Sequence, residues 1–222
     1  MGQEIEYKLR AETNDQLSKA YKRVRQCALE SNERRLQMLT RYYDTEPRYL
    51  QPRKWTLRVR QEDELPKYLG GYKHENAKQI LTFKTPGKNY CRGEWNLERP
   101  LDAPEPTEQC VSLAEGIPPQ PEELAALVAD GAPKELMYLS DFHAVCGAIF
   151  YRVCSMLTLN DGTKIELAAD YGKLFGQTET LDFYELELEL YGGNENRLSE
   201  LAKIAGLPEE HLSKAARAFR LR

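Results

Sequence analysis

Charged side chains occur at every second position in three separate stretches of the sequence. Residues 4–8 (EIEYK) alternate ionised and apolar side chains. Residues 57–60 (LRVR) repeat the alternation with arginine, and residues 185–190 (ELELEL) repeat it with glutamate. Because successive side chains of a β-strand point to opposite faces, each stretch would gather its charges on one face and its apolar side chains on the other.

These charged faces have two readings. An antiparallel strand with one solvated face shows the same alternation, and for any single strand this is the simpler explanation. As a set, however, the strands align like charges, which repel one another on a shared face. If helices cover the apolar faces, the charges must line an enclosed interior instead. Six charged residues on other expected strands would share that interior: Lys84, Arg92, Glu94, Arg152, Glu166 and Asp170.

An interior of this kind would have to hold water and a ligand of opposite charge, because dry burial of so many ions costs too much free energy. Clusters of arginine and lysine suit a polyanion, most simply a chain of phosphates. Clusters of carboxylates suit hard divalent cations such as Mg²⁺ or Mn²⁺. The two together indicate a metal–polyphosphate ligand.

The hydrophobic pattern predicts the elements that position these charges. Strands are expected at residues 3–10, 34–44, 55–62, 79–85, 92–99, 147–159, 163–171 and 180–191. Helices are expected at residues 14–30, from 121, at 195–205 and from Pro208 onward, with a short helix or turn at 133–143. A loop is expected at 63–78, and a loop or a short helix at 104–120. Asn14 or Asp15 would cap the first helix, and residues 160–162 (NDG) favour a hairpin turn. The sequence therefore predicts an α+β fold, an eight-stranded antiparallel β-barrel with a charged lumen, flanked by helices.

Composition narrows the class of protein. A length of 222 residues suits one large domain, and a 41% share of apolar residues is enough for a core. The net charge of −4 gives no reason to expect whole-surface binding to nucleic acid or to an anionic membrane. Without an apolar run that could span a membrane, a signal-peptide pattern or a C-x-x-C pair, we expect a cytoplasmic protein with reduced cysteines. The three scattered histidines argue against a zinc site.

The charged stretches belong to an ordered series of motifs that resembles the CYTH family, the triphosphate tunnel metalloenzymes. Its parts are residues 4–8 (EIEYK), 42–45 (YYDT), 57–60 (LRVR), 82–84 (TFK), Arg152, residues 166–172 (ELAADYG), 185–190 (ELELEL) and 213–217 (SKAAR). The series runs in order from residue 4 to about residue 220. One departure is Asn96, which stands where the family often has a second acid after Glu94; either Glu98 replaces that acid or the site has one acid fewer.

The resemblance implies one CYTH-like domain over residues 1–222, with helical elaborations at about 14–30, 104–143 and 195–220. A linear triphosphate would lie in the tunnel, and a metal-dependent reaction would hydrolyse its terminal phosphoanhydride, most simply in inorganic tripolyphosphate. The phosphate-binding side chains, all of them catalytic except Arg92, would be Lys8, Arg58, Arg60, Lys84, Arg92, Arg152 and Lys214. Mg²⁺ or Mn²⁺ would be held by Glu4, Glu6, Glu187 and Glu189, with Glu94, Glu166, Asp170 and Glu185 as further ligands.

Three alternatives to a triphosphatase stay open at this stage. A class IV adenylate cyclase would use the same tunnel, although the sequence offers no feature that supplies a purine pocket. A thiamine triphosphatase would place a tryptophan beside the arginine strand, but strand parity turns Trp55 away from the face that carries Arg58. A non-catalytic module would bind polyphosphate or a nucleotide without turnover.

Three smaller expectations complete the prediction. Asp44 is expected to organise a turn rather than to bind a ligand. Association into a homodimer is compatible with the sequence. A CHAD domain, the helical polyphosphate-binding module that often follows in related chains, is not expected within these residues.

Overall fold

The computed structural model describes residues 2–65, 77–87, 91–101, 113 and 116–221. Its strands are β1 (Gly2–Ala11), β2 (Glu30–Asp44), β3 (Thr56–Glu64), β4 (Lys78–Thr85), β5 (Cys91–Arg99), β6 (His143–Thr158), β7 (Lys164–Phe175) and β8 (Thr180–Gly192). Its helices are α1 (Asn14–Arg25), α2 (Pro121–Ala129), α3 (Asn196–Ala205) and α4 (Lys214–Ala218), with short 3₁₀ helices η1 (Gln51–Arg53) and η3 (Lys134–Tyr138). The expected strands are confirmed, whereas the expected loops at 63–78 and 104–120 lie largely outside the described residues. Within the described ranges, no helix is long and apolar enough to cross a membrane.

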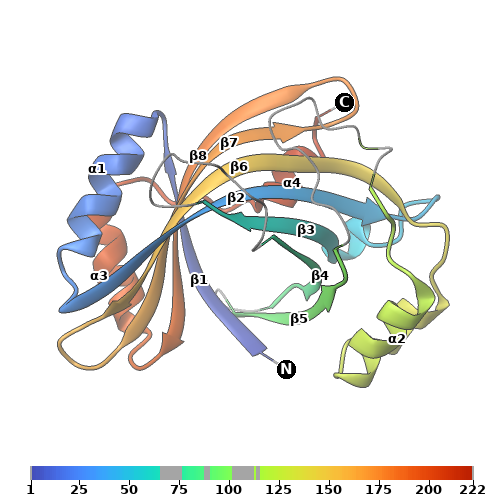
Figure 1. The fold of residues 1–222 in the computed structure, drawn as a ribbon, viewed down its shortest axis with the longest axis horizontal. Helices are drawn as coiled ribbons and strands as arrows, with labels where there is room; N and C mark the ends of the chain where they lie inside the picture. The colour runs from blue at the N-terminus through green and yellow to red at the C-terminus, as the bar shows by residue number, and fades with distance from the viewer. Residues whose placement is uncertain (1, 66–76, 88–90, 102–112, 114–115, 222) are drawn as a thin grey trace.

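The strands form one closed antiparallel barrel in the order β1-β5-β4-β3-β2-β6-β7-β8 (Figure 1). Strand β1 closes the barrel by changing partner along its length. Its residues 2–5 pair with β5, and its residues 6–11 pair with β8. The predicted α+β barrel is therefore confirmed.

Helices α1 and α3 lie against the outside of the barrel and cover the apolar faces of β1, β7 and β8 (Figure 1). Leu9 of β1 and Leu186 and Leu188 of β8 are buried there against Leu17 of α1 and Leu198 of α3. Since these leucines alternate with ionised residues, their burial outside the barrel turns the charges of β1 and β8 toward the lumen. This burial is the condition under which the sequence pattern predicted a charged interior.

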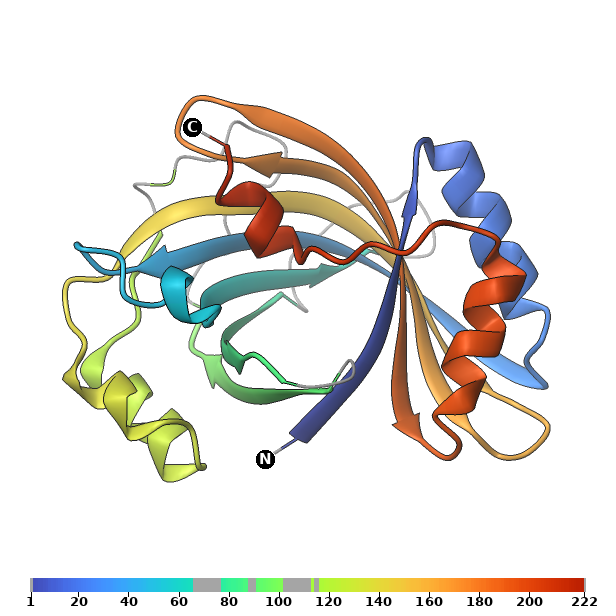
Figure 2. The ribbon, with the colours of Figure 1, turned by 180° about the vertical axis from the view of Figure 1, so that it is seen from behind.

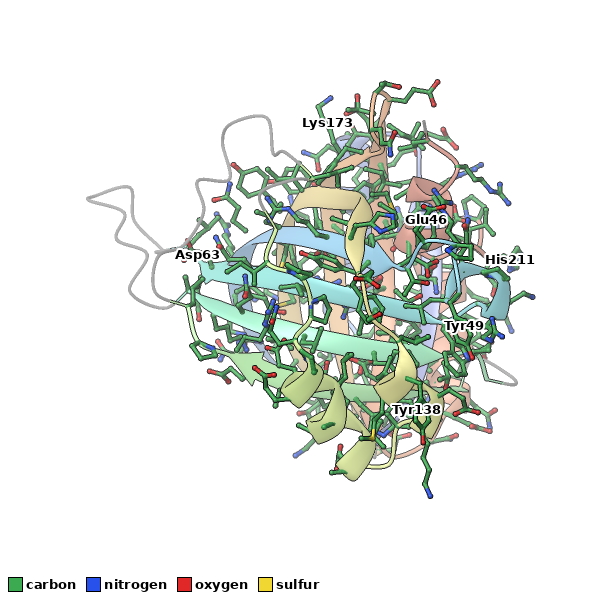
Figure 3. All side chains as sticks on the ribbon, turned by 90° about the vertical axis from the view of Figure 1, so that its right-hand side faces the viewer. Glu46, Tyr49, Asp63, Tyr138, Lys173 and His211 are labelled. Atoms are coloured by element: carbon green, nitrogen blue, oxygen red, sulfur yellow. The ribbon has the colours of Figure 1, made fainter. Side chains whose placement is uncertain are left out.

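A second apolar layer covers the outer faces of β3, β4 and β5. There α2 and η3 pack with Leu57, Phe83 and Trp55, and Trp55 makes an edge contact with Phe83 at a ring-centroid distance of 5.4 Å. Trp55 therefore points away from the lumen, as strand parity predicted. At the end of η3, Tyr138 is 86% exposed and projects from this side of the molecule (Figure 3).

Two helix boundaries differ in detail from the prediction. Helix α1 is capped by Thr13, whose hydroxyl accepts a hydrogen bond from the Gln16 amide at 3.3 Å, rather than by Asn14 or Asp15. The helix ends at Arg25, so the expected continuation to residue 30 is wrong: β2 begins at Glu30. The hairpin between β6 and β7 is confirmed, with Gly162 at φ +81 and its amide donating to the Leu159 carbonyl.

The expected helix beginning at Pro208 is wrong. Strand β8 pairs with one edge of residues 6–11 of β1, and the segment 208–213 runs along the opposite edge. The Arg10 amide donates to the Pro208 carbonyl and the Glu210 amide donates to the Lys8 carbonyl, both at 2.8 Å. These bonds satisfy a strand edge that would otherwise lack partners, which outweighs a local helix signal. Helix α4 begins only at Lys214, capped by Ser213 (Figure 2).

Asp44 organises the loop between β2 and η1. Its buried carboxylate accepts hydrogen bonds from the backbone amides of Thr45, Tyr49, Leu50 and Gln51, at 2.8–3.0 Å. The expectation that Asp44 is a turn residue is therefore confirmed.

We expect Asp44→Ala to lower the free energy of unfolding by about 2–4 kcal/mol, because four backbone donors lose their acceptor, two of them in buried residues. Urea denaturation followed by circular dichroism measures the loss. Asp15→Ala is the matched control, since its side chain is 71% exposed and, among the described residues, pairs only with Lys19 on the same helix. Equal stability of the two variants would contradict this role for Asp44.

Candidate active site in the barrel lumen

A cavity of about 650 Å³ runs through the barrel and is lined mainly by ionised side chains. Of the residues predicted to form the site, it is lined by Glu6, Lys8, Arg58, Arg60, Lys84, Glu94, Arg152, Glu166, Glu187, Glu189 and Lys214. Asp170 and Glu185 are fully buried behind this wall. Glu4 and Arg92 are register partners on β1 and β5, and their side chains lie outside what the structure describes.

One side of the cavity is basic. Arg58 and Arg60 project inward from β3, and the Nε atoms of both are buried without a hydrogen-bond partner. In the part of the chain that the structure describes, no carboxylate lies within 4.0 Å of the Arg58 guanidinium. Burial, followed by repulsion from Arg58, lowers the pKa of Arg60. These two guanidinium groups are therefore positioned to bind an anion.

The opposite side is acidic. Glu6, Glu189 and Glu166 are register partners on three adjacent strands, β1, β8 and β7, and all three line the cavity. In the barrel order, β8 is four strands from β3 in either direction and thus lies across the lumen from it. Burial, followed by the charges of Glu189 and Glu166, raises the pKa of the Tyr191 hydroxyl. The acids thus produce a joint negative potential at this end of β8.

A buried ion-pair network lies on β6, β7 and β8 and includes one residue of α4. Arg152 forms a bidentate pair with Asp170, with both N···O distances 2.7 Å, and also contacts Glu187. The Lys214 ammonium lies 2.8 Å from Asp170 and 2.7 Å from Glu187, and it contacts Glu185 as well. In this structure, cations of the protein itself therefore neutralise the deepest carboxylates.

The pKa shifts in this network follow from burial and pairing. Burial alone would raise the pKa of Glu187, but Lys214 and Arg152 hold it well below its ordinary value. Burial raises the pKa of Glu185 despite the attraction of Lys214. Burial would lower the pKa of Lys214, yet Asp170, Glu185 and Glu187 raise it. Lys214 is consequently charged throughout the physiological pH range.

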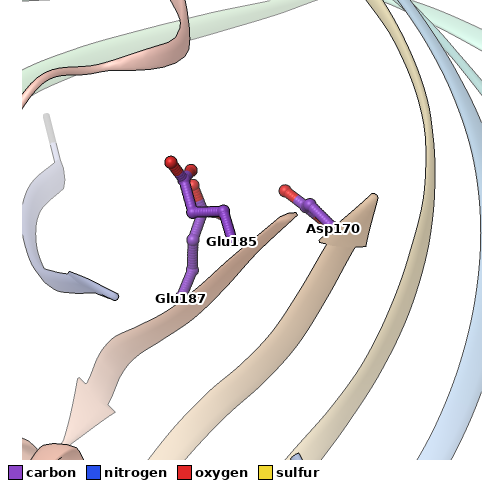
Figure 4. Close-up of side chains that lie close together, drawn as sticks. All are labelled: Asp170, Glu185 and Glu187. Atoms are coloured by element: carbon purple, nitrogen blue, oxygen red, sulfur yellow. The ribbon is translucent and has the colours of Figure 1, made fainter. Parts of the chain in front are cut away.

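Two clusters of carboxylates in the lumen, each of three residues, could hold a divalent cation. Oxygens of Asp170, Glu185 and Glu187 lie within 4.8 Å of one another and converge (Figure 4). The Lys214 ammonium contacts all three, so a metal there would have to displace it. The row of Glu6, Glu189 and Glu166 offers the hard oxygen donors that Mg²⁺ or Mn²⁺ prefers and lies nearer the end of β8. This row therefore fits a divalent cation better than the cluster of Asp170, Glu185 and Glu187, which Lys214 already neutralises.

Part of the lumen is apolar. Leu36 and Met38 of β2 and Phe150 of β6 pack against Ala215 and Ala218 of α4. Helix α4 thus fills one side of the barrel interior and brings Lys214 to the ion-pair network (Figure 2).

Several residues that line the cavity were not predicted from the sequence. They are Arg34, Tyr42, Glu62, Lys78, Thr82, Asn96 and Tyr191. Strand parity could have found Glu62, Lys78 and Tyr191, because each continues the alternation of a predicted inward residue. Asn96 donates to Glu94 at 3.0 Å and accepts from Thr82 at 2.7 Å. Glu98 is exposed and does not line the cavity, so β5 presents one acid fewer there.

Comparison with known proteins agrees with this geometry. The family model for the CYTH domain matches residues 2–219. The chain belongs to the CYTH domain family. This CYTH chain is also similar in fold to solved structures of low sequence identity.

PH1819 from Pyrococcus horikoshii is 18% identical over 99% of both chains, with a TM-score of 0.54. HpAC1 from Hippeastrum, an adenylyl cyclase candidate described as having a dominant triphosphatase activity, is 22% identical and has a TM-score of 0.52. The match covers 98% of this chain and 95% of that one. An adenylate cyclase candidate from Vibrio parahaemolyticus is 17% identical over 96% of both chains, with a TM-score of 0.53. At these identities the likeness shows a shared fold.

We expect Lys214→Ala to lower the free energy of unfolding by about 3–5 kcal/mol at pH 8, because it leaves buried carboxylates without their cation. Without Lys214 the pKa values of these carboxylates rise in the folded state, so stability falls as the pH rises through them. The loss should therefore be smaller at pH 5 than at pH 8, as measured by urea denaturation at both values.

Lys214→Arg should retain most of the stability, since it keeps the charge. Lys173→Ala is the matched surface control: Lys173 pairs with Asp182 at 2.7 Å but is 57% exposed and projects at the rim of the molecule (Figure 3). We expect little change for that variant. A Lys214→Ala loss that is the same at pH 5 and pH 8 would show that the carboxylates are not its cause.

Proposed function

We propose that this CYTH protein is a metal-dependent hydrolase that cleaves the terminal phosphoanhydride of a linear triphosphate, most simply inorganic tripolyphosphate. The observation that carries the proposal is the division of charge across one lumen, with Arg58 and Arg60 on β3 and a row of carboxylates on β1, β7 and β8. A chain of phosphates fits the basic side, and a divalent cation fits the acidic side.

The basic side chains would bind the phosphate oxygens and stabilise the negative charge that develops during transfer of the phosphoryl group. Arg58 and Arg60 have buried Nε donors available for this purpose. Lys8 and Lys84 pair with carboxylates at the cavity wall, so they would exchange a carboxylate partner for a phosphate when the substrate binds. Arg152 would keep its bidentate pair with Asp170 and bind a phosphate through its remaining N–H donors. Arg92, the register partner of Glu4, would extend this set.

Glu6, Glu166 and Glu189 would hold Mg²⁺ or Mn²⁺, with Glu4 beside them on β1. A bound divalent cation supplies charge neutralisation on the phosphate chain and lowers the pKa of coordinated water. Glu94 pairs with Lys84 at 2.7 Å and orients Asn96. Asp170, Glu185 and Glu187 would act mainly by fixing Arg152 and Lys214 in position.

The described activity of HpAC1 supports this choice by analogy of fold alone. The position of Trp55 on the outer face, packed on Phe83, gives no support to a thiamine-binding role. The aromatic side chains that reach the lumen in the described part of the chain are Tyr42 and Tyr191, which lie on two different strands, whereas Trp95 packs on Phe83 in the outer apolar layer.

The central test is phosphate release from tripolyphosphate, ATP and thiamine triphosphate with Mg²⁺ or Mn²⁺. We expect tripolyphosphate to be the best substrate and Glu6→Gln to lower kcat by roughly 10²–10³-fold, because it removes a charged oxygen ligand from the acidic side. Glu12→Gln is the matched control, since Glu12 lies just beyond β1 and its side chain is 68% exposed.

The outcomes separate the candidate functions. Full activity in Glu6→Gln would reject the metal-binding role of this residue. Binding without turnover in the wild type would indicate a binding module, and cyclic AMP formed from ATP would indicate a cyclase.

Chelation gives an independent check. In excess EDTA we expect phosphate release to stop while tripolyphosphate still binds, because the basic side of the cavity does not depend on the cation. Isothermal titration calorimetry measures the binding, and the activity should return when Mn²⁺ is added. Undiminished turnover in EDTA would exclude a metal-dependent reaction.

A further inference from the structure

Two buried polar atoms on neighbouring strands have no hydrogen-bond partner among the described residues: the Thr40 hydroxyl oxygen of β2 and the Arg60 Nε atom of β3. Thr40 and Arg60 are register partners, so their side chains lie on the same face of the sheet, with Cβ atoms roughly 5 Å apart. Because Arg60 lines the lumen, the Thr40 side chain also points inward, where it is 1% exposed. The two atoms therefore belong to one small region of the inner wall.

Packing alone does not account for the Thr40 hydroxyl. Its neighbours on the inner face of β2, Met38 and Tyr42, belong to the apolar cluster around α4, and its register partner on β6 is Ala148. Valine has the same shape as threonine and would fill this position without burying a polar atom, which costs free energy when it lacks a partner. Of the two register partners of Thr40, only Arg60 carries a polar side chain. The hydroxyl is therefore explained best by a role toward Arg60.

Arg152 shows how an anchored arginine of this lumen is held. Its Nε atom and one terminal nitrogen donate to the two oxygens of Asp170, both at 2.7 Å. In the described part of the chain, Arg60 instead makes a single hydrogen bond, from a terminal nitrogen to Glu62 at 3.3 Å, and Glu62 also contacts Lys78. One such bond does not fix the plane of a guanidinium group, and a bound phosphate would replace it. An anchor on the Nε atom would fix that plane.

We infer that Thr40 is a positioning residue for Arg60, with one buried water molecule linking the Thr40 hydroxyl to the Arg60 Nε atom. The water accepts a hydrogen bond from Nε and shares a second one with the hydroxyl, so both buried atoms gain a partner. The terminal nitrogens of Arg60 stay free to exchange Glu62 for a phosphate oxygen. The inference refines the proposed function and rests on it for the phosphate: the Nε donor of Arg58 serves the ligand, whereas that of Arg60 serves the protein.

Hydrogen exchange of the Arg60 Nε–H group, followed by proton–nitrogen NMR, tests the link without any ligand. We expect exchange to be roughly fivefold faster in Thr40→Val, which keeps the shape of the side chain but removes the hydroxyl. Thr40→Ser keeps the hydroxyl and should retain the slow exchange of the wild type. Arg60→Lys, which lacks the Nε–H group, identifies the resonance. Equal exchange rates in the wild type and in Thr40→Val would overturn the link.

Calorimetry with tripolyphosphate in EDTA tests the consequence for binding. In Thr40→Val we expect Kd to rise roughly fivefold, the equivalent of one hydrogen bond, while the midpoint of urea denaturation stays close to that of the wild type. Thr40→Ser should restore the binding. In an Arg60→Lys background, Thr40→Val should have no further effect on Kd, because Thr40 acts through Arg60.

Three results would overturn the inference: unchanged binding in Thr40→Val, a weakening of the same size in the Arg60→Lys background, or a loss of binding that follows a loss of stability. A wild type that does not bind tripolyphosphate would reject the proposed function. The exchange rates of the Arg60 Nε–H group would then still decide whether Thr40 holds this side chain.

Discussion

The charged lumen depends on the burial of leucines on the other face of the same strands. Leu9, Leu186 and Leu188 are nearly inaccessible under α1 and α3, and a strand that buries one set of side chains must turn the alternate set the other way. The apolar contacts outside the barrel thus compensate for placing ions inside it. A one-residue slip of β8 would exchange the two sets and abolish both the core and the cavity.

The lumen keeps its charges by pairing most of them with one another. Buried pairs contribute little net stability, and their value lies in the specific arrangement that they enforce. Asp170 and Glu185 are held by Arg152, Lys214 and Arg217, which come from β6 and from the C-terminal helix. The fully buried carboxylates Asp170 and Glu185 thus position the basic side chains that contact them. The carboxylates of Glu6, Glu189 and Glu166, by contrast, line the cavity, where a ligand could reach them.

The alternation of charges predicted the barrel and most of the ionised side chains that line the cavity, because strand parity is a local property. It could not show that Asp170 and Glu185 lie behind the wall, since their burial depends on cations from distant elements. The segment 208–213 was misread for the same reason: its hydrogen bonds are made with β1, about two hundred residues away in sequence. Arg34 was missed because it lies at the start of a strand that carries no aligned charges.

The pairing of β1 with β8 and with Pro208 and Glu210 has a consequence for the newly made protein. Strand β1 leaves the ribosome before these partners and finds them only after residues 180–210 have been synthesised. Until then its hydrogen-bonding edges stay open, and a topology with such distant contacts closes slowly. The alternating charges on β1 then have a second use, since ionised side chains discourage pairing with a strand of another molecule.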